Sequence, residues 1–323
     1  RPAWFLISPT WSIEDASIAE DMRDRAVLHR LQSPHHRLIF VANTPGEADL
    51  MRHQGEATFF YNKTANTSER IFRPLDDVRL EFDAIYNAQL VPWKRHELSL
   101  GIDTCAFLFY RDYTLPDAAA VEAAIIARHA TAPGHAFINP YGKDGQPVRL
   151  PLSEINRHLN RAGIGLCLSE REGPMFASTE YLLAGLPIVT TPSAGGRHVY
   201  YDEEYCWTVS ADPRSVADAV QALKAKQIPR AHVRDRTLRR LDSDRERFLA
   251  LLNVILEEAG SRRRLTKPWP FQKDVTMDWM LPREAVDRAV HGVVDGFDRN
   301  PRRRFLWRLQ RRALALRRQY LRG

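Results

Sequence analysis

The stretch from residue 164 to residue 196 constrains the fold of this chain more strongly than any other part of its sequence. It opens with an apolar run, Ile164 to Leu168, which predicts a buried strand. A turn at Glu172 to Pro174 follows, and then a short helix that Gly185 ends, because glycine accepts the left-handed backbone conformation found at helix ends. A second strand, Ile188 to Thr191, closes the unit. Such a unit is typical of a parallel α/β sheet and directs a helix N-terminus at its carboxyl edge, where these sheets bind ligands.

Two carboxylates frame the turn of this stretch. Glu172 lies in the turn, and Glu180 follows it by about two helical turns and lies on the helix, for which Ser178 and Thr179 are candidate caps. A carboxylate accepts hydrogen bonds at two oxygens, so it can hold a vicinal diol of a sugar or a ribose. The helix N-terminus between them suits a diphosphate. The pattern predicts a sugar nucleotide spanning the turn, and a solvated helix face is the alternative.

The same stretch resembles the donor-site signature of retaining GT-B glycosyltransferases, family 4 in particular. The resemblance is carried by Glu172 and Glu180 with seven residues between them, by the Gly-Leu-Pro strand from Gly185, and by the Gly-Gly turn that ends the stretch. It implies that Glu172 contacts the donor sugar and Glu180 the ribose. Beside these two glutamates, the turn and the helix N-terminus offer backbone amides, so we expect Gly173, Phe176, Ala177 and Ser178 to bind the donor as well.

A second segment, residues 87 to 96, resembles the Gly-Arg-Leu, three residues, Lys-Gly motif of the same family. Lys94 matches the lysine, which in the family neutralises the donor diphosphate. Gln89 stands at the arginine position, and Ala88 and Arg95 stand at the two glycine positions. A neutral amide holds a diphosphate more weakly than a guanidinium does, and Arg95 is a candidate to compensate. The alternative reading is a basic turn that follows a strand.

The alternation of strands and helices predicts an α/β fold. With the resemblance, we expect a GT-B-like architecture: a doubly wound parallel-sheet donor domain plus a smaller N-terminal α/β domain. We place the reduced, acceptor-side N-terminal domain at residues 1–80 and the Rossmann-like nucleotide-sugar domain at 81–260. A basic helical extension takes up 261–323. In the family the first domain is about twice as long, so here it is reduced or its beginning is absent.

Local patterns predict the individual elements. We expect strands at residues 37–42, 57–61, 82–89, 104–110, 136–139, 148–152 and 207–210. We expect helices at 12–31 capped by Ser12, 45–54, 116–129, 153–162 capped by Ser153, a helix capped by Asp212 that runs to about Ala225, and one or two helices over 230–258.

The last segment of the chain differs from the rest in charge. Residues 261–323 hold 17 Lys and Arg against 6 Asp and Glu, a net charge of +11, while the whole chain carries +7. The pattern of residues 301–321 predicts a helix with an apolar stripe and arginines on its other faces. Such a basic amphipathic helix favours an anionic membrane surface as partner. A helix docked on the protein is the alternative. No nucleic acid is expected, because no recognition motif accompanies the charge.

Composition excludes several classes of protein. No apolar run is long enough to span a membrane as a helix, and no signal peptide is visible. The three cysteines are far apart, which favours a reducing compartment and no structural metal. We therefore expect a cytoplasmic protein, with a peripheral position at the inner face of the membrane if the basic segment binds there.

The resemblance implies a retaining glycosyltransferase of cell-surface polysaccharide or glycolipid synthesis. It would move a sugar from a nucleoside diphosphate sugar to a glycan or lipid-linked acceptor, with no cofactor. Lys94 and Glu172 are the expected catalytic residues: Lys94 holds the departing diphosphate and Glu172 orients the sugar. Two alternatives stay open. A non-catalytic protein of glycan assembly is favoured by Gln89 and the short first domain, and a GT-B sugar-nucleotide epimerase would need acid and base groups that the sequence does not identify.

Overall fold

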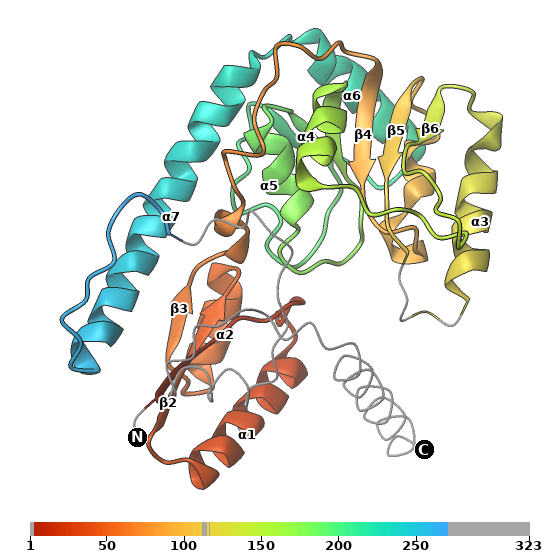
Figure 1. Ribbon diagram of the computed structural model, residues 1–323. Coiled ribbons are helices and arrows are strands. Elements are labelled where there is room, and N and C mark those ends of the chain that lie inside the picture. Colours follow the sequence, from red (N-terminus) through yellow and green to blue (C-terminus); the bar gives the residue numbers. More distant parts are fainter. Residues whose placement is uncertain (1–2, 112–114, 116, 271–323) are drawn as a thin grey trace. The chain divides into compact units, whose positions relative to one another are not determined.

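The structure of the protein, a computed structural model, describes residues 3–111, 115 and 117–270. The described part contains two parallel β-sheets, one of three strands and one of six (Figure 1). The helix predicted at 301–321, on which the expected membrane partner depends, lies outside the described residues. Within them, no helix is both long and apolar enough to cross a membrane.

The first sheet and its helices form the three-stranded lobe, residues 3–66, with strand order β1-β2-β3. Its elements are β1 (Ala3–Ile7), α1 (Ala16–Gln32), β2 (His36–Ala42), α2 (Pro45–His53), β3 (Thr58–Phe60) and the 3₁₀ helix η1 (Lys63–Asn66). Side chains alternate along a strand, so Leu38 and Phe40 of β2 pack into a core with Ala19 of α1 and Met51 of α2. Val41 points to the other face and joins the larger core of the molecule.

The second sheet builds the six-stranded lobe, residues 82–225. Its elements are β4 (Phe82–Asn87), η2 (Pro92–Lys94), η3 (His96–Ser99), β5 (Cys105–Leu108), α3 (Ala118–Arg128), η4 (His129–Thr131), β6 (His135–Phe137), α4 (Leu152–Asn160), β7 (Ala162–Cys167), α5 (Phe176–Leu183), β8 (Ile188–Thr190), β9 (Cys206–Thr208) and α6 (Pro213–Ala225). The strand order is β6-β5-β4-β7-β8-β9, so β4 and β7 are neighbours where the winding reverses. In open α/β sheets this switch point, at the carboxyl ends of the strands, is where ligands bind.

Two helices of this lobe show how the sequence fixes the packing. α6 begins as predicted, because the Asp212 carboxylate accepts a hydrogen bond from the Ser215 amide at 2.8 Å and a proline occupies the first turn. α5 lies close over β7: a Cβ added at Gly165 would be 2.5 Å from the Tyr181 ring. Any larger residue at 165 would push α5 away from the sheet.

A single helix, α7 (Arg230–Glu258), ties the two lobes together. It contacts α5 of one lobe and η1 of the other. The Phe248 ring stacks on Tyr61 with a centroid distance of 4.2 Å. Arg245, 3% exposed, donates hydrogen bonds to the Ala65 and Thr67 carbonyl oxygens at 2.8 and 3.0 Å.

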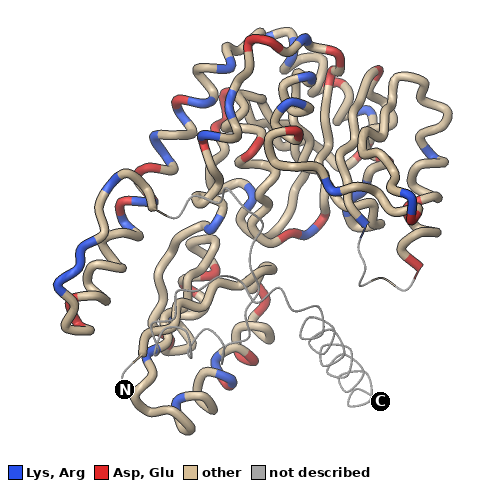
Figure 2. Tube along the Cα trace, in the orientation of Figure 1, with Lys and Arg blue, Asp and Glu red and all other residues tan. Residues whose placement is uncertain are grey.

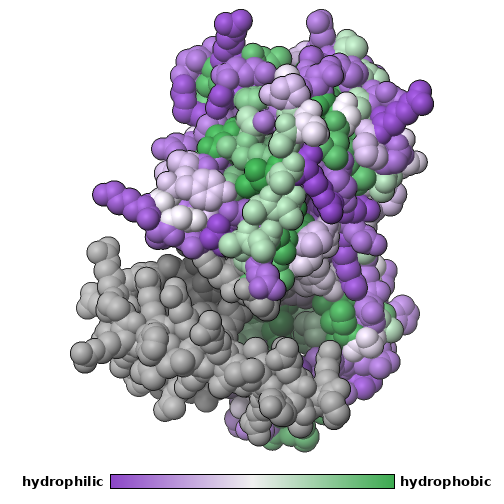
Figure 3. Space-filling view, turned by 90° about the vertical axis from the view of Figure 1, so that its right-hand side faces the viewer, coloured by the Kyte–Doolittle hydropathy of each residue, from purple (hydrophilic) through white to green (hydrophobic). Residues whose placement is uncertain are grey.

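The surface differs between the two sides of the six-stranded lobe. Basic residues recur along α7 and in the segment that follows it, where Arg262, Arg263 and Arg264 are exposed (Figure 2). The opposite side, which α3 and β6 form, mixes hydrophilic and hydrophobic residues (Figure 3). All three cysteines are buried free thiols.

Two local predictions were wrong. Residues 148–151 form no strand, because the Asn139 side chain and the Pro140 carbonyl hold Val148 in a loop through bonds of 2.9 and 2.7 Å. The helix after this loop begins at Leu152 with Pro151 in the capping position and ends at Asn160, so Ser153 is not its cap.

The start of α1 is also displaced from the prediction. α1 begins at Ala16, and Asp15 caps it by accepting a hydrogen bond from the Ser17 amide at 2.9 Å. Ser12 instead accepts a bond from the Glu14 amide at 3.3 Å in the loop before the helix. A carboxylate one residue before the helix outcompetes the more distant hydroxyl as a cap.

Candidate functional site

The switch point of the six-stranded sheet brings two of the predicted residues into contact. Lys94 ends η2, which follows β4, and Glu172 lies in the turn after β7. Because β4 and β7 are neighbours, the Lys94 ammonium and a Glu172 carboxylate oxygen meet in an ion pair. The side chains are only 11% and 7% exposed. Two buried charges are tolerated because each neutralises the other.

Neighbouring groups fix this pair in place. The Ser169 hydroxyl, at the carboxyl end of β7, donates to the same Glu172 oxygen. The Tyr86 hydroxyl donates to the Lys94 carbonyl oxygen at 2.7 Å. Burial raises the pKa of Tyr86 far above its ordinary value, so this hydroxyl keeps its proton and its hydrogen bond.

The Gly-Gly turn lies directly against the Glu172 turn. Gly195 has φ of +102°, and a Cβ there would be 1.6 Å from the Glu172 carbonyl oxygen. Only glycine fits such an approach in that backbone conformation. The Glu172 amide donates to the Ala194 carbonyl at 3.3 Å, which closes the contact between the two turns.

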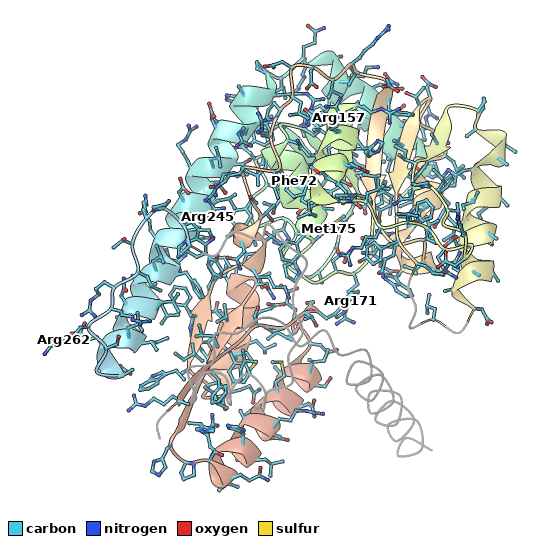
Figure 4. The ribbon with its side chains drawn as sticks, viewed as in Figure 1. Phe72, Arg157, Arg171, Met175, Arg245 and Arg262 are labelled. Atoms are coloured by element: carbon cyan, nitrogen blue, oxygen red, sulfur yellow. The ribbon has the colours of Figure 1, made fainter. Side chains whose placement is uncertain are left out.

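The first turn of α5 begins two residues earlier than its predicted caps. Met175 stands at the capping position without a side-chain bond, so Ser178 and Thr179 are not caps. Their hydroxyls are used elsewhere: Ser178 donates to the Met175 carbonyl at 2.7 Å, and Thr179 donates to Thr64 of the other lobe at 2.8 Å. Figure 4 shows Met175 at this end of α5 and Arg171 in the preceding turn.

This helix end has the properties of an anion site. The amides of Phe176 and Ala177 lie in the first turn of α5, where the N–H groups of a helix point along its axis toward a ligand. The helix dipole adds partial positive charge there. With Lys94 close by, the edge favours a group that carries negative charge, such as a diphosphate.

Glu180 is half-buried on α5, near the end of β4. The Asn87 side-chain amide donates to its Oε2 at 3.3 Å, and the Asn87 backbone amide donates to the Tyr181 hydroxyl at 2.6 Å. Asn87 thus links the last residue of β4 to two successive residues of α5. Glu172 and Glu180 have different partners: Glu172 pairs with Lys94 and accepts from Ser169, whereas Glu180 accepts from Asn87.

The backbone conformation of Arg95 gives a physical reason for the glycine that the family motif has at this position. Its φ is +51°, in the left-handed region that is costly for residues with a Cβ. Its guanidinium donates to the Leu168 carbonyl at 2.7 Å and to the Thr191 hydroxyl at 2.8 Å. These bonds join the Lys94 segment to the carboxyl ends of β7 and β8. Gln89 is half-buried in the segment between β4 and η2. That Gln89 and Arg95 contact a donor stays a prediction.

Sequence reasoning missed Ser169, Tyr86 and Arg197 at this site. Arg197 is 3% exposed and donates to the Ser169 and Thr191 carbonyl oxygens. Its position directly after the Gly-Gly turn was the one available signal. Within the described residues, no three His, Cys, Asp or Glu side chains come together as ligands for a metal ion.

Loops of the three-stranded lobe press on the same turns. The buried Asn62 side chain donates to the Gly196 carbonyl at 2.8 Å and to the Asn43 carbonyl at 3.0 Å. A Cβ at Gly173 would lie 2.4 Å from the Thr10 carbonyl oxygen. The carboxyl ends of both sheets therefore meet at the candidate site.

The architecture of this chain has counterparts among solved structures. No protein-family model matches the sequence, and no curated protein matches it. Among solved structures, HepE from Anabaena in complex with UDP and glucose matches with a TM-score of 0.56 at 13% identity, over 78% of this chain and 71% of that chain. Sucrose-phosphate synthase from Thermosynechococcus elongatus matches with a TM-score of 0.58 at 14% identity, over 79% and 67%. TarM of S. aureus matches with a TM-score of 0.54 at 14% identity, over 78% of this chain and half, 50%, of that chain.

The chain has the GT-B fold. The matching structures are retaining GT-B glycosyltransferases of the group 1 type, the family that the motifs resemble. The predicted fold class, a GT-B fold with a doubly wound sheet and a smaller first lobe, is confirmed. At these identities the similarity establishes the GT-B fold and not the reaction, so the roles of the site residues belong to the proposal below.

Proposed function

We propose that this protein is a retaining glycosyltransferase that moves a sugar from a nucleoside diphosphate donor to a glycan or lipid-linked acceptor. The observation that carries the proposal is the buried Lys94–Glu172 pair at the switch point of a GT-B fold. The two residues belong to separate motifs, and the fold makes them neighbours beside a helix N-terminus. A structural ion pair has no need of that helix end.

The chemistry follows from the charges at this edge. A departing nucleoside diphosphate gains negative charge as the glycosidic bond breaks, and groups fixed in advance around that charge lower the barrier. Lys94 and the amides of Phe176 and Ala177 are placed to supply them. Without donor, Glu172 neutralises Lys94. The diphosphate competes for Lys94, which releases the Glu172 carboxylate to accept hydrogen bonds from hydroxyls of the donor sugar.

Glu180 is the proposed ribose contact. It lies just over one turn into α5, on the far side of the helix N-terminus from Glu172, and the Asn87 amide orients one of its oxygens. A diphosphate between the two carboxylates gives the order sugar, diphosphate, ribose along the turn and helix. HepE was crystallised with UDP and glucose, which makes uridine diphosphate sugars the first donors to test.

A non-catalytic GT-B protein is the second candidate, and Gln89 favours it. A neutral side chain at the arginine position leaves Lys94 as the matching cation of the motif. Such a protein would bind a nucleoside diphosphate without turning over its sugar. An epimerase would release an altered sugar nucleotide rather than a glycoside, so product analysis separates all three.

The deciding experiment incubates the full chain with a panel of uridine, guanosine, adenosine and thymidine diphosphate sugars and a mixture of glycan acceptors. Proton NMR of the products should show a new glycoside with the anomeric configuration of the donor. Glu172→Gln should abolish the product, whereas Glu170→Gln, an exposed glutamate of the same turn, should not. Nucleotide binding with no product from any donor would favour the non-catalytic alternative.

We also propose a peripheral membrane position in cell-surface glycan or glycolipid synthesis, on the charge of residues 301–323. Attraction to an anionic leaflet weakens as salt rises. The full chain should therefore co-sediment with anionic liposomes at low salt and less at high salt, and a chain lacking 301–323 should stay in solution. Equal sedimentation of both chains would refute this role.

A further inference from the structure

Trp11 is an exposed aromatic side chain in a loop that is otherwise held firmly. The loop joins β1 to α1, and the Trp11 side chain is 42% exposed while its neighbours Ser12 and Ile13 are 1% and 3% exposed. On average, proteins bury most of the surface of a tryptophan side chain. An exposed indole ring in a fixed loop is therefore a candidate binding surface.

Bonds on both sides of Trp11 hold the loop. The Pro9 carbonyl oxygen accepts hydrogen bonds from the Asn43 amide at 3.2 Å and from the Lys63 ammonium at 2.7 Å. On the other side, the Ile13 backbone amide donates to the buried Glu47 carboxylate at 3.0 Å. The exposure of the ring is therefore set by an anchored backbone.

The loop also lies on the candidate active site. The Thr10 carbonyl oxygen and the Trp11 Cα would be 2.4 and 3.1 Å from a Cβ on Gly173, the residue after Glu172. The Ser12 Cβ would be 3.1 Å from a Cβ on Gly195. Trp11 therefore projects from the three-stranded lobe at the point where that lobe covers both turns of the site.

We propose that Trp11 is the platform on which a pyranose ring of the acceptor stacks, so that the acceptor is a saccharide at its reacting end. This rests on the proposed function for the direction of transfer, but the binding of a saccharide by Trp11 does not. One face of a pyranose is lined by C–H groups and packs on the apolar face of an indole, while its hydroxyls stay available to polar groups.

Polar groups for those hydroxyls come from the same loop and from the turn that the loop covers. Glu14, three residues on, is exposed, and its carboxylate accepts a hydrogen bond from the Thr44 hydroxyl at 2.9 Å. A carboxylate that accepts one such bond has lone pairs left for sugar hydroxyls. Arg171, exposed in the turn before Glu172, offers donors from the other lobe. An aromatic plane with a carboxylate in the same loop and a guanidinium in the facing turn is suited to a polyhydroxylated ring rather than to an acyl chain.

Saturation-transfer NMR on the full chain tests this without any turnover. The probes are methyl α- and β-pyranosides of glucose, galactose, mannose and N-acetylglucosamine, with hexanol as an apolar control. We expect saturation transfer to the ring C–H protons of at least one pyranoside and a loss of at least fivefold in signal in Trp11→Ala. Trp11→Tyr should keep most of the signal, because it keeps a flat aromatic face. Leu31→Ala, which removes an apolar side chain 76% exposed on the same lobe, is the matched control and should behave as the natural protein does.

An unchanged pyranoside signal in Trp11→Ala would overturn the proposal, and so would the absence of saturation transfer to any pyranoside. A hexanol signal that alone depends on Trp11 would also refute it, in favour of an apolar ligand. If a donor is found, Trp11→Ala should raise the KM for a saccharide acceptor at least tenfold and change the Kd for the nucleotide by less than twofold. Failure of transfer with Trp11-dependent pyranoside binding would contradict the proposed function and leave this inference standing.

Discussion

The carboxyl edges of the two sheets meet at one place but bring different chemistry to it. The six-stranded sheet contributes the charged pair Lys94 and Glu172 and a helix N-terminus. The bonds that the three-stranded lobe makes to these turns come from neutral amides and hydroxyls, Asn62 and Thr64 among them. Under the proposed function, the six-stranded edge carries out the reaction, and the three-stranded edge supports it and presents Trp11 to the acceptor.

Breaking the charged pair should have the largest effect. Lys94→Met removes the proposed diphosphate contact and should lower turnover roughly 10²- to 10³-fold, as loss of a group that stabilises developing charge does. It also leaves the Glu172 carboxylate buried without its cation, which costs about 3–5 kcal/mol of stability. Steady-state kinetics and urea unfolding measure the two losses.

A double variant separates stability from catalysis. Lys94→Met combined with Glu172→Gln removes both charges and should recover most of the lost stability while turnover stays low. A double variant with normal turnover would show that the pair serves only the fold.

The brace is the set of bonds that the Asn62 side chain of the three-stranded lobe makes at the site. Breaking it should lower the free energy of unfolding and leave the affinity for nucleotide nearly unchanged. Asn62→Ala leaves the Gly196 and Asn43 carbonyls and the Thr64 amide without their bonds to the Asn62 side chain. We expect a loss of about 2–3 kcal/mol in the free energy of unfolding and a change in nucleotide Kd below threefold. Asn66→Ala, which removes the oxygen that accepts a hydrogen bond from the Tyr61 hydroxyl, is the control and should cost less. A tenfold loss of nucleotide affinity in Asn62→Ala would mean that the brace is part of the binding site.

The sequence predicted what depends on local pattern and missed what depends on contacts between distant segments. The alternation of apolar runs and the Asp212–Pro213 signal gave the order of elements in the six-stranded lobe, because these features act within a few residues. The false strand at 148–152 failed because the Asn139 side chain, beyond the reach of a strand pattern, holds that segment as a loop. The caps assigned to Ser178 and Thr179 failed because their hydroxyls bond to other partners.

The site itself was predicted in part. The motifs selected Lys94, Glu172 and Glu180, but their spacing says nothing of the ion pair, which arises because the winding of the sheet makes β4 and β7 neighbours. Arg197 and Ser169 carry no pattern of their own. Ser169 acts through its bond to Glu172, and Arg197 through its bonds to the Ser169 and Thr191 carbonyls, and the folded arrangement of the turns decides both.

A buried histidine gives the six-stranded lobe a pH dependence of its own. Burial, with His129 and Lys94 nearby, lowers the pKa of His96 to about 3, and among the described residues neither ring nitrogen has a hydrogen-bond partner. The unfolded chain takes up a proton near pH 6.5 that the folded chain refuses, so stability is full above that pH and falls as the pH drops toward 3.

Replacing His96 tests the direction of this pH dependence of stability. Between pH 7 and pH 5 the refused proton costs about 2 kcal/mol, and His96→Phe should remove that share of the acid sensitivity. The ring lies between Tyr86 and Phe107, so phenylalanine fits the aromatic surroundings. Urea unfolding at both pH values measures the difference. Identical pH slopes for the two proteins would contradict a neutral buried His96.

The smallest effect should separate backbone strain from side-chain bonds at Arg95. Arg95→Ala loses the bonds to Leu168 and Thr191 and keeps the left-handed backbone, whereas Arg95→Gly loses the bonds and relieves the strain. The glycine variant should be more stable than the alanine variant by about 1 kcal/mol. The melting temperature of Arg95→Gly should be higher than that of Arg95→Ala, and the reverse order would refute backbone strain at residue 95.

Calorimetric titration with nucleoside diphosphates tests the central claim most directly. The full chain is titrated with UDP, GDP, ADP and dTDP, each beside its nucleoside, and so are Lys94→Met and Glu180→Ala. The account predicts that one diphosphate binds at least tenfold more tightly than its nucleoside, that Lys94→Met removes most of this difference, and that Glu180→Ala weakens diphosphate and nucleoside alike. If no diphosphate binds, or if Lys94→Met binds it as tightly as the natural protein does, the carboxyl edge of the six-stranded sheet is not a donor site.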